Sequence, residues 1–470
     1  AYGGYAARAF GRDELRPVTG GAVDNFGGLG ATLVDSLGTL WLFGMVDEYE
    51  AARRWVASEA FAPAEAGEVV VFETVIRILG GLVSAFQLTD DRVFLHRAEQ
   101  LALALAPAFD SPTGIPYAKC NLAQRRCYGK SSHGQLSAST LLAEAGTVAL
   151  EYRALAMHSH NPAVIALRAK AEHVLHLIKS ATRHADPDRG PIGRGLAPSK
   201  ISVDTGRFVT TYVTVGAPSD SYFEYLGKVW VQGAYQEDIY RDMLIDWVDV
   251  MHDTLLHTTP TGDTMVYELG GTDIITKMDH FSCYIPGVLS ITADRIGSDT
   301  RRARWIQMAA NITQTCRNMY ARSPIGLAPE NIRVHNGKWL MNGGYELRPE
   351  VLEAIFFMWR RTHDPKYREW AWEIFSAIER HCKTQYGYAT LAKAKTTRPV
   401  QRDTMHSFFI SETLRYLYLI FSDDEVLPLD KFVFNTEAHP LLIMPALGAQ
   451  GGTSLGGADQ AVCDANVASV

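Results

Sequence analysis

The sequence predicts an all-α fold whose helices form two concentric rings around a central cavity. Apolar residues recur with the 3.6-residue period of a helix in about a dozen or more segments of ordinary length. Signals for strands are few, and no linker of domain-boundary character divides the chain. Every second helical segment carries acids beside an apolar stripe. This alternation predicts an inner ring that faces a cavity and an outer ring that surrounds it.

The first elements follow from apolar periodicity and from residues that stop helices. An amphipathic helix is expected over residues 1–15, where a proline then ends it, and a glycine-rich loop follows over residues 25–30. Residues 31–45 show the helical period again, with Asp35 and Thr39 four positions apart on one face. The chain is therefore expected to open with two helices joined by a loop.

The segment 71–88 shows the same design more clearly. Seven apolar residues from Phe72 to Phe86 form a wide stripe, while Glu73 and Arg77 fall on a second stripe of polar and small residues. A helix with one apolar face and one small or polar face suits a wall between the core and a cavity.

The remaining helices are predicted in the same way, with one interruption. Residues 186–212 are expected to form a loop with a hairpin, because a run rich in Asp, Pro and Gly precedes Val-Asp-Thr-Gly-Arg-Phe-Val. Further helices are expected over 90–108, 137–157, 162–181, 219–230, 235–257, 279–287, 297–320, 350–361, 365–382 and 404–421. We therefore expect one catalytic domain over residues 1–442 and a flexible tail over residues 443–470, which is low in aromatic residues.

Composition narrows the class of protein. The 470 residues are 47% apolar and 21% charged, as in ordinary soluble globular proteins. A formal net charge of −7 offers no basic surface for nucleic acid, and no uninterrupted apolar run is long enough to cross a bilayer. Because the chain starts at Ala1 and not at Met, we expect that the natural N-terminus is missing and that any membrane anchor would lie there.

The six cysteines show no metal-finger spacing. Cys120 and Cys127 close a short polar loop and are candidates for a local disulfide. One sequon, Asn311-Ile312-Thr313, is compatible with a secretory compartment. A single sequon also arises by chance, so neither feature decides the compartment.

Acids on or beside apolar helices are the candidates for chemistry. They are Glu73, Asp220, Glu330, Glu350, Glu353 and Glu412. Each alone has a structural explanation as a cap, a rim charge or half of an ion pair, as the i,i+4 spacing of Glu73 and Arg77 illustrates. Together they favour function, because unpaired carboxylates are costly to bury. A pocket of carboxylates, arginines and aromatic rings is typical of carbohydrate chemistry.

Residues 434–440, Phe-Asn-Thr-Glu-Ala-His-Pro, are the candidate for a metal site. Thr436 offers a hydroxyl and a carbonyl oxygen, and such hard oxygens suit Ca²⁺ better than Zn²⁺ or Cu²⁺. Taken alone, this block is more simply a capped turn. His439 within it, and His280 at a helix start, also have ordinary structural explanations as core or capping residues.

Motifs along the chain resemble those of the class I α-mannosidases, glycoside hydrolase family 47, which trim α-1,2-linked mannose from N-glycans. In chain order they are Gly-Ala-Thr-Leu-Val-Asp35-Ser-Leu, Phe72-Glu73-Thr-Val-Ile-Arg77-Ile-Leu-Gly-Gly81, Asp220-Ser-Tyr-Phe-Glu224-Tyr, His280-Phe-Ser-Cys283, Gly326-Leu-Ala-Pro-Glu330, Leu347-Arg-Pro-Glu350-Val-Leu-Glu353, Ser407-Phe-Phe and Phe434-Asn-Thr436-Glu-Ala-His-Pro440. They follow the family's order over residues 1–442, and jointly they are highly specific.

The resemblance implies a fold, a cofactor and roles for residues. The fold would be an (α/α)7 barrel plugged by a short β-hairpin, with Ca²⁺ held at the cavity floor by the two oxygens of Thr436 and by waters. Hydrolysis would invert the anomeric carbon, with Glu73 as general acid, Glu350 as the base that activates water, and Asp220 as a third essential carboxylate. Inversion implies acid and base carboxyl groups roughly 6.5–9.5 Å apart. The residues implied to bind sugar are Arg77, His280, Glu330, Arg348, Glu353, Phe409, Glu412 and Glu437.

The resemblance also implies a compartment and a partner. Cys283 and Cys316 would match the family's disulfide, which places the protein in the oxidising lumen of the endoplasmic reticulum or Golgi, or outside the cell. The partners would be high-mannose N-glycans on glycoproteins, and the enzyme would act as a monomer.

Two departures from the family pattern leave alternatives open. Gly38 stands where the family has a second acid after Asp35, which motivates a second hypothesis: a mannose-binding quality-control protein of the same fold with little or no turnover. The intact Glu73 and Glu350 favour hydrolysis instead. Pro218 stands where the endoplasmic-reticulum type has an arginine that selects the mannose branch. This favours the broader branch acceptance of Golgi-type members.

Overall fold

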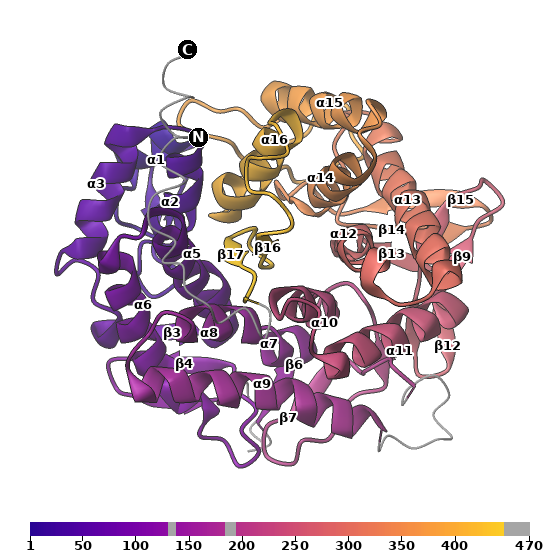
Figure 1. Cartoon of the computed structure of the whole chain (residues 1–470). Coiled ribbons are helices and arrows are strands. Elements are labelled where there is room, and N and C mark those ends of the chain that lie inside the picture. Colours follow the sequence, from indigo (N-terminus) through magenta and orange to yellow (C-terminus); the bar gives the residue numbers. More distant parts are fainter. Residues whose placement is uncertain (130–137, 184–193, 446–470) are drawn as a thin grey trace.

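The structure of this chain is a computed structural model that describes residues 1–129, 138–183 and 194–445. Within these residues, helices form two rings, one inside the other (Figure 1). Seven helices form the inner ring, and neighbours in the ring contact each other around a closed circle. They are α2 (Ala31–Leu42), α5 (Gly80–Thr89), α8 (Ala149–Ala156), α10 (Asp220–Gln232), α12 (Ile285–Thr292), α14 (Glu350–Thr362) and α16 (Leu414–Phe421), which closes onto α2 through the turn before it. The predicted all-α barrel is confirmed.

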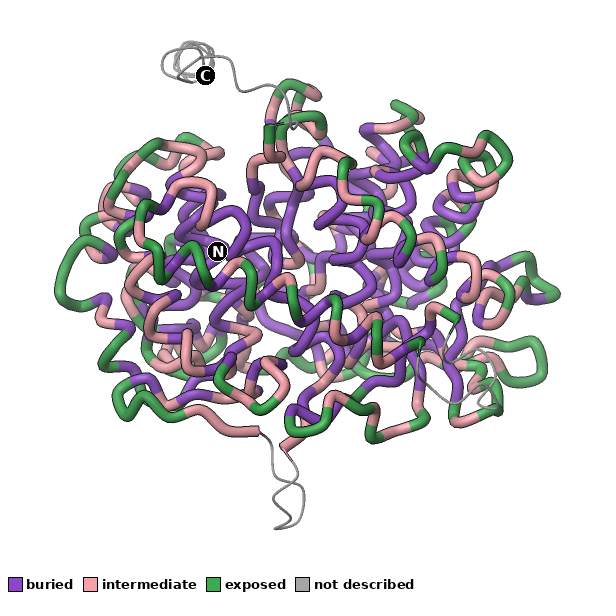
Figure 2. Tube along the Cα trace, turned by 60° about the horizontal axis from the view of Figure 1, so that its bottom comes forward, coloured by how far each residue is buried: buried purple, intermediate pink, exposed green. Residues whose placement is uncertain are grey.

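The outer helices cover the inner ring. They are α1 (Tyr2–Arg8), α3 (Val46–Ala57), α6 (Arg92–Leu105), α9 (Pro162–Arg183), α11 (Asp238–Thr254), α13 (Asp299–Ala321) and α15 (Lys366–His381). Their sequences suit this position, since α6 buries only one stripe, from Phe94 to Leu105 at helical spacing. The inner helix α2 is instead buried at ten consecutive residues, from Ala31 to Leu40. Figure 2 shows the same contrast across the molecule, with buried segments inside and exposed ones outside.

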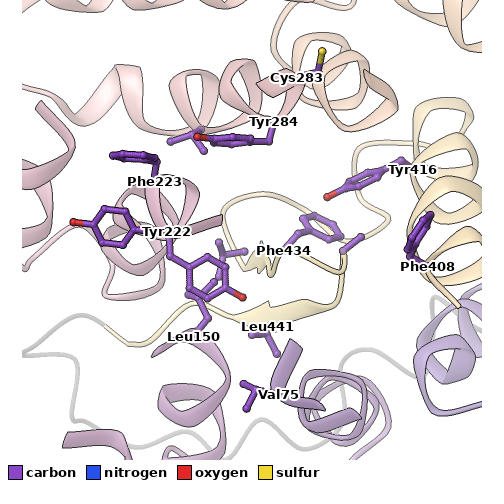
Figure 3. Close-up of a cluster of buried hydrophobic side chains, with 14 of the residues drawn as sticks. Val75, Leu150, Tyr222, Phe223, Cys283, Tyr284, Phe408, Tyr416, Phe434 and Leu441 are labelled. Carbon is purple, nitrogen blue, oxygen red and sulfur yellow. The ribbon is translucent and has the colours of Figure 1, made fainter. Parts of the chain in front are cut away.

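A β-hairpin fills the centre of the inner ring (Figure 1). Its strands β16 (Phe432–Phe434) and β17 (Pro440–Leu442) pair antiparallel, with Phe434 opposite Pro440, and they contact α5, α8 and α10. Figure 3 shows Phe434 and Leu441 among aromatic and aliphatic side chains of the surrounding helices. The hairpin's apolar residues are therefore part of the main core, which fixes where its turn lies.

The other strands are short and belong to the connections between helices. They are β1 (Glu14–Leu15), β2 (Ala22–Val23), β3 (Glu68–Val70), β4 (Lys119–Asn121), β5 (Arg126–Tyr128), β6 (Ser139–Leu141), β7 (Lys200–Ser202), β8 (Tyr212–Val213), β9 (Leu256–Thr258), β10 (Thr264–Val266), β11 (Glu268–Gly270), β12 (Asp273–Ile275), β13 (Lys277–Asp279), β14 (Asn331–His335) and β15 (Lys338–Asn342). Strands this short leave little period-2 pattern in a sequence, so most were not predicted.

The prediction of one helix over residues 1–15 is wrong beyond Arg8. The chain leaves α1, turns at Gly11 in the left-handed region (φ 78°), and enters strand β1. The buried carboxylate of Asp13 accepts three backbone N–H groups from the loop that leads into α2. This tertiary contact outweighs the local helical pattern.

The hairpin predicted within residues 186–212 is present in part. Ile201 pairs with Phe208 across a turn, while β7 pairs mainly with β6. Residues 186–193 of the predicted loop, and residues 446–470, which make up nearly all of the predicted tail, lie outside the described residues.

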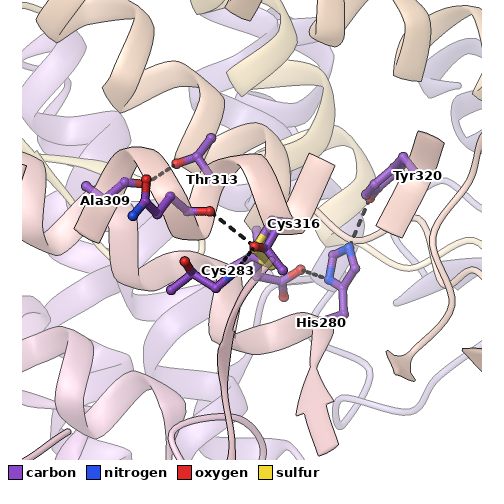
Figure 4. Close-up of a disulfide and its surroundings, with 10 residues drawn as sticks. His280, Cys283, Ala309, Thr313, Cys316 and Tyr320 are labelled. Carbon is purple, nitrogen blue, oxygen red and sulfur yellow. Dashed lines mark hydrogen bonds and ion pairs between the residues drawn. A yellow bond between two sulfur atoms is a disulfide. The ribbon is translucent and has the colours of Figure 1, made fainter. Parts of the chain in front are cut away.

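Two disulfides tie the connections to the rings. Cys120 pairs with Cys127 between β4 and β5, and Cys283 pairs with Cys316. The second disulfide joins the segment that enters α12 to the outer helix α13 (Figure 4). Both pairings agree with the predictions.

The segment Val71–Thr89 has the length and apolar composition of a membrane span, but most of it is buried within the protein. It is the inner-ring helix that combines α4 (Val71–Glu73), a π-helical stretch and α5. Its apolar face packs in the core, as predicted for the wall of a cavity.

Candidate active site

The predicted acids lie at one end of the inner ring. Asp220 and Glu350 are the first residues of α10 and α14, and His280 opens the 3-10 turn that precedes α12. Glu73 and Glu412 also lie in the first turns of inner helical segments. Free N–H groups and the helix dipole favour negative charge at helix starts. This end of the ring therefore suits a cluster of carboxylates.

Two π-helical stretches shape the wall of this site. The stretch Thr74–Leu79 carries Arg77, and the stretch Phe409–Thr413 carries Glu412. A π turn contains an extra residue, so it redirects side chains relative to an ordinary helix, and such turns are frequent at functional sites. Apolar periodicity predicts the helices but not these local insertions.

Glu350 is held in its ionised form by two basic side chains. Nδ1 of His280 lies 3.0 Å from Oε2 of Glu350, and its Nε2 lies 3.0 Å from the hydroxyl of Tyr320 (Figure 4). Burial raises the pKa of Glu350, but His280 and the nearby Arg348 outweigh burial, and the pKa is lowered below its ordinary value. Arg348 itself donates two hydrogen bonds to Glu330, at 3.1 and 2.7 Å.

Arg77 connects the inner helix to the hairpin turn. Its Nε donates to Glu73 at 2.8 Å, and its Nη1 donates to Glu437 at 2.7 Å. The guanidinium carbon lies 5.3 Å from the ring centroid of Phe26 and 5.6 Å from that of Phe408. Only 10% of the side chain is exposed, so these two carboxylates provide most of its charge compensation.

The two phenylalanines of the motif Ser407-Phe-Phe lie in different surroundings. The ring of Phe409, predicted to bind sugar, is fully buried and lies 5.1 Å from the ring of Tyr388. The ring of Phe408 stacks on His406 at 4.8 Å and lies over the guanidinium of Arg77. Phe409 therefore packs within the wall, while Phe408 adjoins the charged cluster.

Asp220 keeps its proton to an unusually high pH. Burial, together with the negative charges of Glu224, Asp279 and Glu350, raises the pKa of Asp220 to about 7. The hydrogen bond that Asp220 accepts from the N–H of Ser221 acts in the opposite direction but is outweighed. A carboxyl group with this pKa exchanges its proton near neutral pH.

The floor of the site is the turn of the central hairpin. The hydroxyl of Thr436 donates to Glu224 at 2.8 Å. Lys228, which has no exposed side-chain surface, donates to Glu224, to Glu353 at 3.0 Å and to the carbonyl of Asn435 at 3.4 Å. Lys228 is therefore the cation that two carboxylates share beneath the turn.

Sequence reasoning did not select Glu224 or Lys228 as site residues. The available signal was the i,i+4 spacing of Asp220, Glu224 and Lys228 on a helix that is otherwise apolar and aromatic. This spacing is also common on solvated faces, and only the structure shows that all of α10 after its first residue is buried.

The three predicted catalytic acids lie on segments that contact the hairpin turn around Thr436. Arg77 links Glu73 to Glu437, the residue after Thr436. Helix α10 supplies both Asp220 and the carboxylate that contacts the Thr436 hydroxyl. Lys228 donates to Glu353 of α14. Glu353 lies one helical turn after Glu350, the third acid, which is the first residue of that helix. The structure thus brings together residues from four separate segments: residues 71–79, α10, α14 and the turn of the hairpin.

The site contains more buried acid than base. Burial and the charge of Glu437 raise the pKa of Glu412 well above its ordinary value, and burial likewise raises the pKa of Glu437 against the opposing charge of Arg77. Burial raises the pKa of Glu353 to about 7 despite its contact with Lys228. This excess of negative charge is one that a bound cation would compensate.

Oxygen atoms are the available ligands for such a cation. Thr436 presents its hydroxyl, and among the described residues no N–H group donates to its carbonyl oxygen. Within the same residues, no three side chains of His, Cys, Asp or Glu converge as a direct ligand set. A hard cation that uses waters as further ligands fits this arrangement better than zinc.

Beneath the turn, Glu151 leads to a prediction about pH and stability. Its Oε1 accepts from Tyr225 at 2.6 Å and from Asn435 at 2.8 Å, while Oε2 has no hydrogen-bond partner in residues 1–129, 138–183 and 194–445. Burial raises its pKa from 4.5 to about 7, so the native state binds a proton that the unfolded state releases above about pH 4.5. Stability from this proton is therefore present at low pH and is lost as pH rises to about 7.

Glu151→Gln removes this loss, since glutamine keeps a carbonyl acceptor without a charge. Without added divalent cation, the variant is expected to gain about 3 kcal/mol of unfolding free energy relative to the natural chain between pH 4.5 and pH 7.5. Urea denaturation at several pH values measures this difference. Parallel pH curves for the two proteins would show that Glu151 is already ionised in the native state.

Comparisons with known proteins identify the family of this chain. The sequence profile described as Glycosyl hydrolase family 47 matches residues 1–443. A mannosyl-oligosaccharide 1,2-alpha-mannosidase of Arabidopsis thaliana is 38% identical over 448 residues, which cover 94% of this chain and 77% of that protein. A mannosyl-oligosaccharide 1,2-alpha-mannosidase IA of Sus scrofa is 37% identical over 452 residues, which cover 94% of this chain and 66% of that protein.

A solved structure extends the comparison to three dimensions. The alpha-1,2-mannosidase of Trichoderma reesei superposes with a TM-score of 0.84 at 26% identity, covering 94% of this chain and 96% of that one. The profile match covers every predicted site residue. The chain therefore belongs to glycosyl hydrolase family 47.

Proposed function

We propose that this protein is a Ca²⁺-dependent, inverting α-1,2-mannosidase that removes terminal α-1,2-linked mannose from high-mannose N-glycans. Membership of the family and the names of the relatives support the reaction. The observation that supports the proposal is that the segments carrying Glu73, Asp220 and Glu350 all contact the turn that holds Thr436 or its neighbours. The chain covers 77% of its Arabidopsis relative and 66% of the pig relative, so the proposal concerns the part that these proteins share.

Glu350 is proposed as the base that takes a proton from the attacking water. Its lowered pKa supports this role, because a base must be ionised at the working pH. Glu73 is proposed as the acid that protonates the leaving oxygen. Glu73 accepts a hydrogen bond from Arg77, and burial raises the pKa of Asp220 to about 7. We therefore propose that Asp220 is the carboxyl group that keeps a proton available in the site.

Ca²⁺ is proposed to bind the hydroxyl and carbonyl oxygens of Thr436. Two features support this ligand set: the carbonyl oxygen has no donor among the described residues, and the surrounding carboxylates can orient waters. When bound, the cation would supply positive charge at the cavity floor and an anchor for sugar hydroxyl groups. Arg77 and Arg348 are placed to bind other hydroxyl groups, each stabilised by its own carboxylate.

The proposed compartment is the lumen of the secretory pathway, or the exterior of the cell. Two disulfides support an oxidising compartment. Pro218, two residues before Asp220, offers no charged side chain to select one mannose branch. This supports the proposal that the enzyme accepts several branches.

Release of free mannose tests the proposal. Incubation with a high-mannose N-glycan is expected to release mannose, first as the β-anomer, and EDTA is expected to stop the release until Ca²⁺ is restored. Chromatography of the glycan products identifies the branches removed, and NMR identifies the anomer. Measurable glycan binding with background turnover would instead favour the mannose-binding quality-control protein.

A further inference from the structure

Arg415 is a buried cation without a carboxylate partner. It is the second residue of α16, and its side chain is fully buried next to the hairpin turn. Among the described residues, no Asp or Glu oxygen lies within 4.0 Å of its guanidinium nitrogens. A buried arginine usually has an acid or several carbonyls as partners, because isolated charge is costly in the core. This arrangement therefore calls for a specific reason to keep the residue.

The guanidinium of Arg415 contacts the hairpin turn directly. Its Nη1 donates to the carbonyl of Ala438 and lies 3.4 Å from Nδ1 of His439, while its Nε lies 3.1 Å from the hydroxyl oxygen of Thr39. Ala438 adopts a left-handed backbone conformation with φ 57°. A residue other than glycine needs compensating contacts to stay in this region, and Arg415 provides one at the carbonyl of this residue.

Two further contacts define the same turn. Oδ1 of Asn435 accepts the N–H groups of Glu437 and His439, each at 2.9 Å. Nε2 of His439 lies 2.9 Å from Oδ1 of Asp35, and both side chains are fully buried. The turn is therefore fixed on one side by its own asparagine and on the other by Asp35 and Arg415.

Gly38 leaves one nitrogen of this arginine free. Nη2 of Arg415 is buried and has no hydrogen-bond partner within the part of the chain that the structure describes. A Cβ atom at Gly38, in the middle of α2, would lie 3.1 Å from this nitrogen and 3.5 Å from Cδ1 of Leu88. A short side chain at position 38 would therefore meet Nη2 directly, after the guanidinium moves by a few tenths of an ångström.

We propose that Arg415 is a positioning residue that orients the turn Asn435–His439, and with it Thr436 and Glu437, and that this hold is incomplete because Gly38 offers Nη2 no acceptor. The proposal rests on the proposed function, in which Thr436 binds the cation and Glu437 contacts sugar. It predicts that the geometry of the turn, and so cation affinity, changes when either residue changes.

The first experiment removes the contacts that Arg415 makes with the turn. Arg415→Lys keeps the charge but cannot reach both Ala438 and Thr39, and Arg415→Met removes the charge. Both variants are expected to bind Ca²⁺ at least about 10-fold more weakly in titration calorimetry of the full chain, with Arg415→Met the weaker. Hydrogen exchange of the amides in residues 435–442 is expected to become faster than in the natural chain.

Arg153 provides the matched control for burial and size. It is also fully buried, but it pairs with Glu172 and Glu237 and has no hydrogen bond to residues 435–442 among the described residues. Arg153→Lys is expected to lower thermal stability without changing Ca²⁺ affinity or amide exchange in residues 435–442. If Arg415→Lys behaves like Arg153→Lys in both measurements, Arg415 has only a structural role and the proposal is wrong.

The second experiment gives Nη2 of Arg415 an acceptor at position 38. Gly38→Asp is expected to slow amide exchange in residues 435–442 and to bind Ca²⁺ a few-fold more tightly, because a charge-assisted hydrogen bond to Nη2 replaces a missing one. Two control variants separate the effect of the new charge from other effects. Gly38→Ala measures the effect of replacing glycine within a helix, and Gly38→Asn measures the effect of the added side-chain volume without charge. The gain should disappear in the Gly38→Asp/Arg415→Met double variant.

The two readouts distinguish this inference from the proposed function. If the natural chain does not bind Ca²⁺, the proposed cofactor is wrong, while amide exchange in residues 435–442 still tests the role of Arg415. If the chain binds Ca²⁺ but Gly38→Asp changes neither affinity nor exchange more than Gly38→Asn does, the inferred role of the free nitrogen at Gly38 is overturned.

Discussion

Glu350→Gln is expected to lower kcat by about 10²–10⁴-fold while the affinity for glycan stays within about threefold. Glutamine keeps the size and hydrogen-bonding shape of the side chain, but it cannot take a proton from water. The structure supports this expectation because His280 and Arg348 hold the natural carboxylate in its basic form. Single-turnover rates and calorimetric glycan affinity, measured with Ca²⁺ present, give the two quantities separately.

Glu330→Gln is the matched control for this experiment. Glu330 pairs with Arg348 in the same part of the site, but among the described residues it has no hydrogen bond or ion pair with Glu350. Its loss is expected to weaken glycan binding more than it lowers kcat. If Glu350→Gln instead weakens glycan affinity by as much as it lowers kcat, then Glu350 binds the sugar and another group activates the water.

Lys228→Met is expected to lower the free energy of unfolding by about 3–5 kcal/mol. Methionine fills the same volume, but it leaves Glu224 and Glu353 buried together without their shared cation. Proton uptake by one of these carboxyl groups relieves part of the penalty, so the loss should be larger at pH 8 than at pH 5.5. Urea denaturation in the absence of divalent cations measures both values.

A double variant tests whether this loss comes from the shared charge. Lys228→Met/Glu353→Gln carries one acid fewer, so it is expected to be more stable than the sum of the two single losses predicts. Strict additivity, or a loss below about 1 kcal/mol for Lys228→Met, would mean that the lysine contributes packing and not charge compensation. Added Ca²⁺ should recover part of the stability of Lys228→Met if the cation binds beside it.

The sequence predicted the acids of the candidate site better than it predicted the buried cations and the backbone conformation there. Glu73, Asp220 and Glu350 stand out because each interrupts an apolar pattern at a helix start. Lys228 does not, because a lysine four residues after a glutamate is equally typical of a solvated helix face. The packing position of Phe409 behind the wall likewise depends on a π turn that no periodicity reveals.

The fold followed a similar division. Long amphipathic segments determine both rings, since a helix that must bury one stripe or all its faces has few alternatives. The end of α1 was missed because a buried carboxylate, Asp13, attracts the N–H groups of a distant loop. Local propensity cannot include such a contact.

By itself, the sequence determined the ring architecture and selected the acids and the threonine turn of the candidate site, because these depend on spacing along each helix and on motifs read in order. Tertiary structure alone decided which acids are ionised and which cations compensate them. Arg77 meets Glu437 across 360 residues, and Asp35 meets His439 across 404. Electrostatic energy depends on distance in space and on burial, neither of which is a property of separation along the chain.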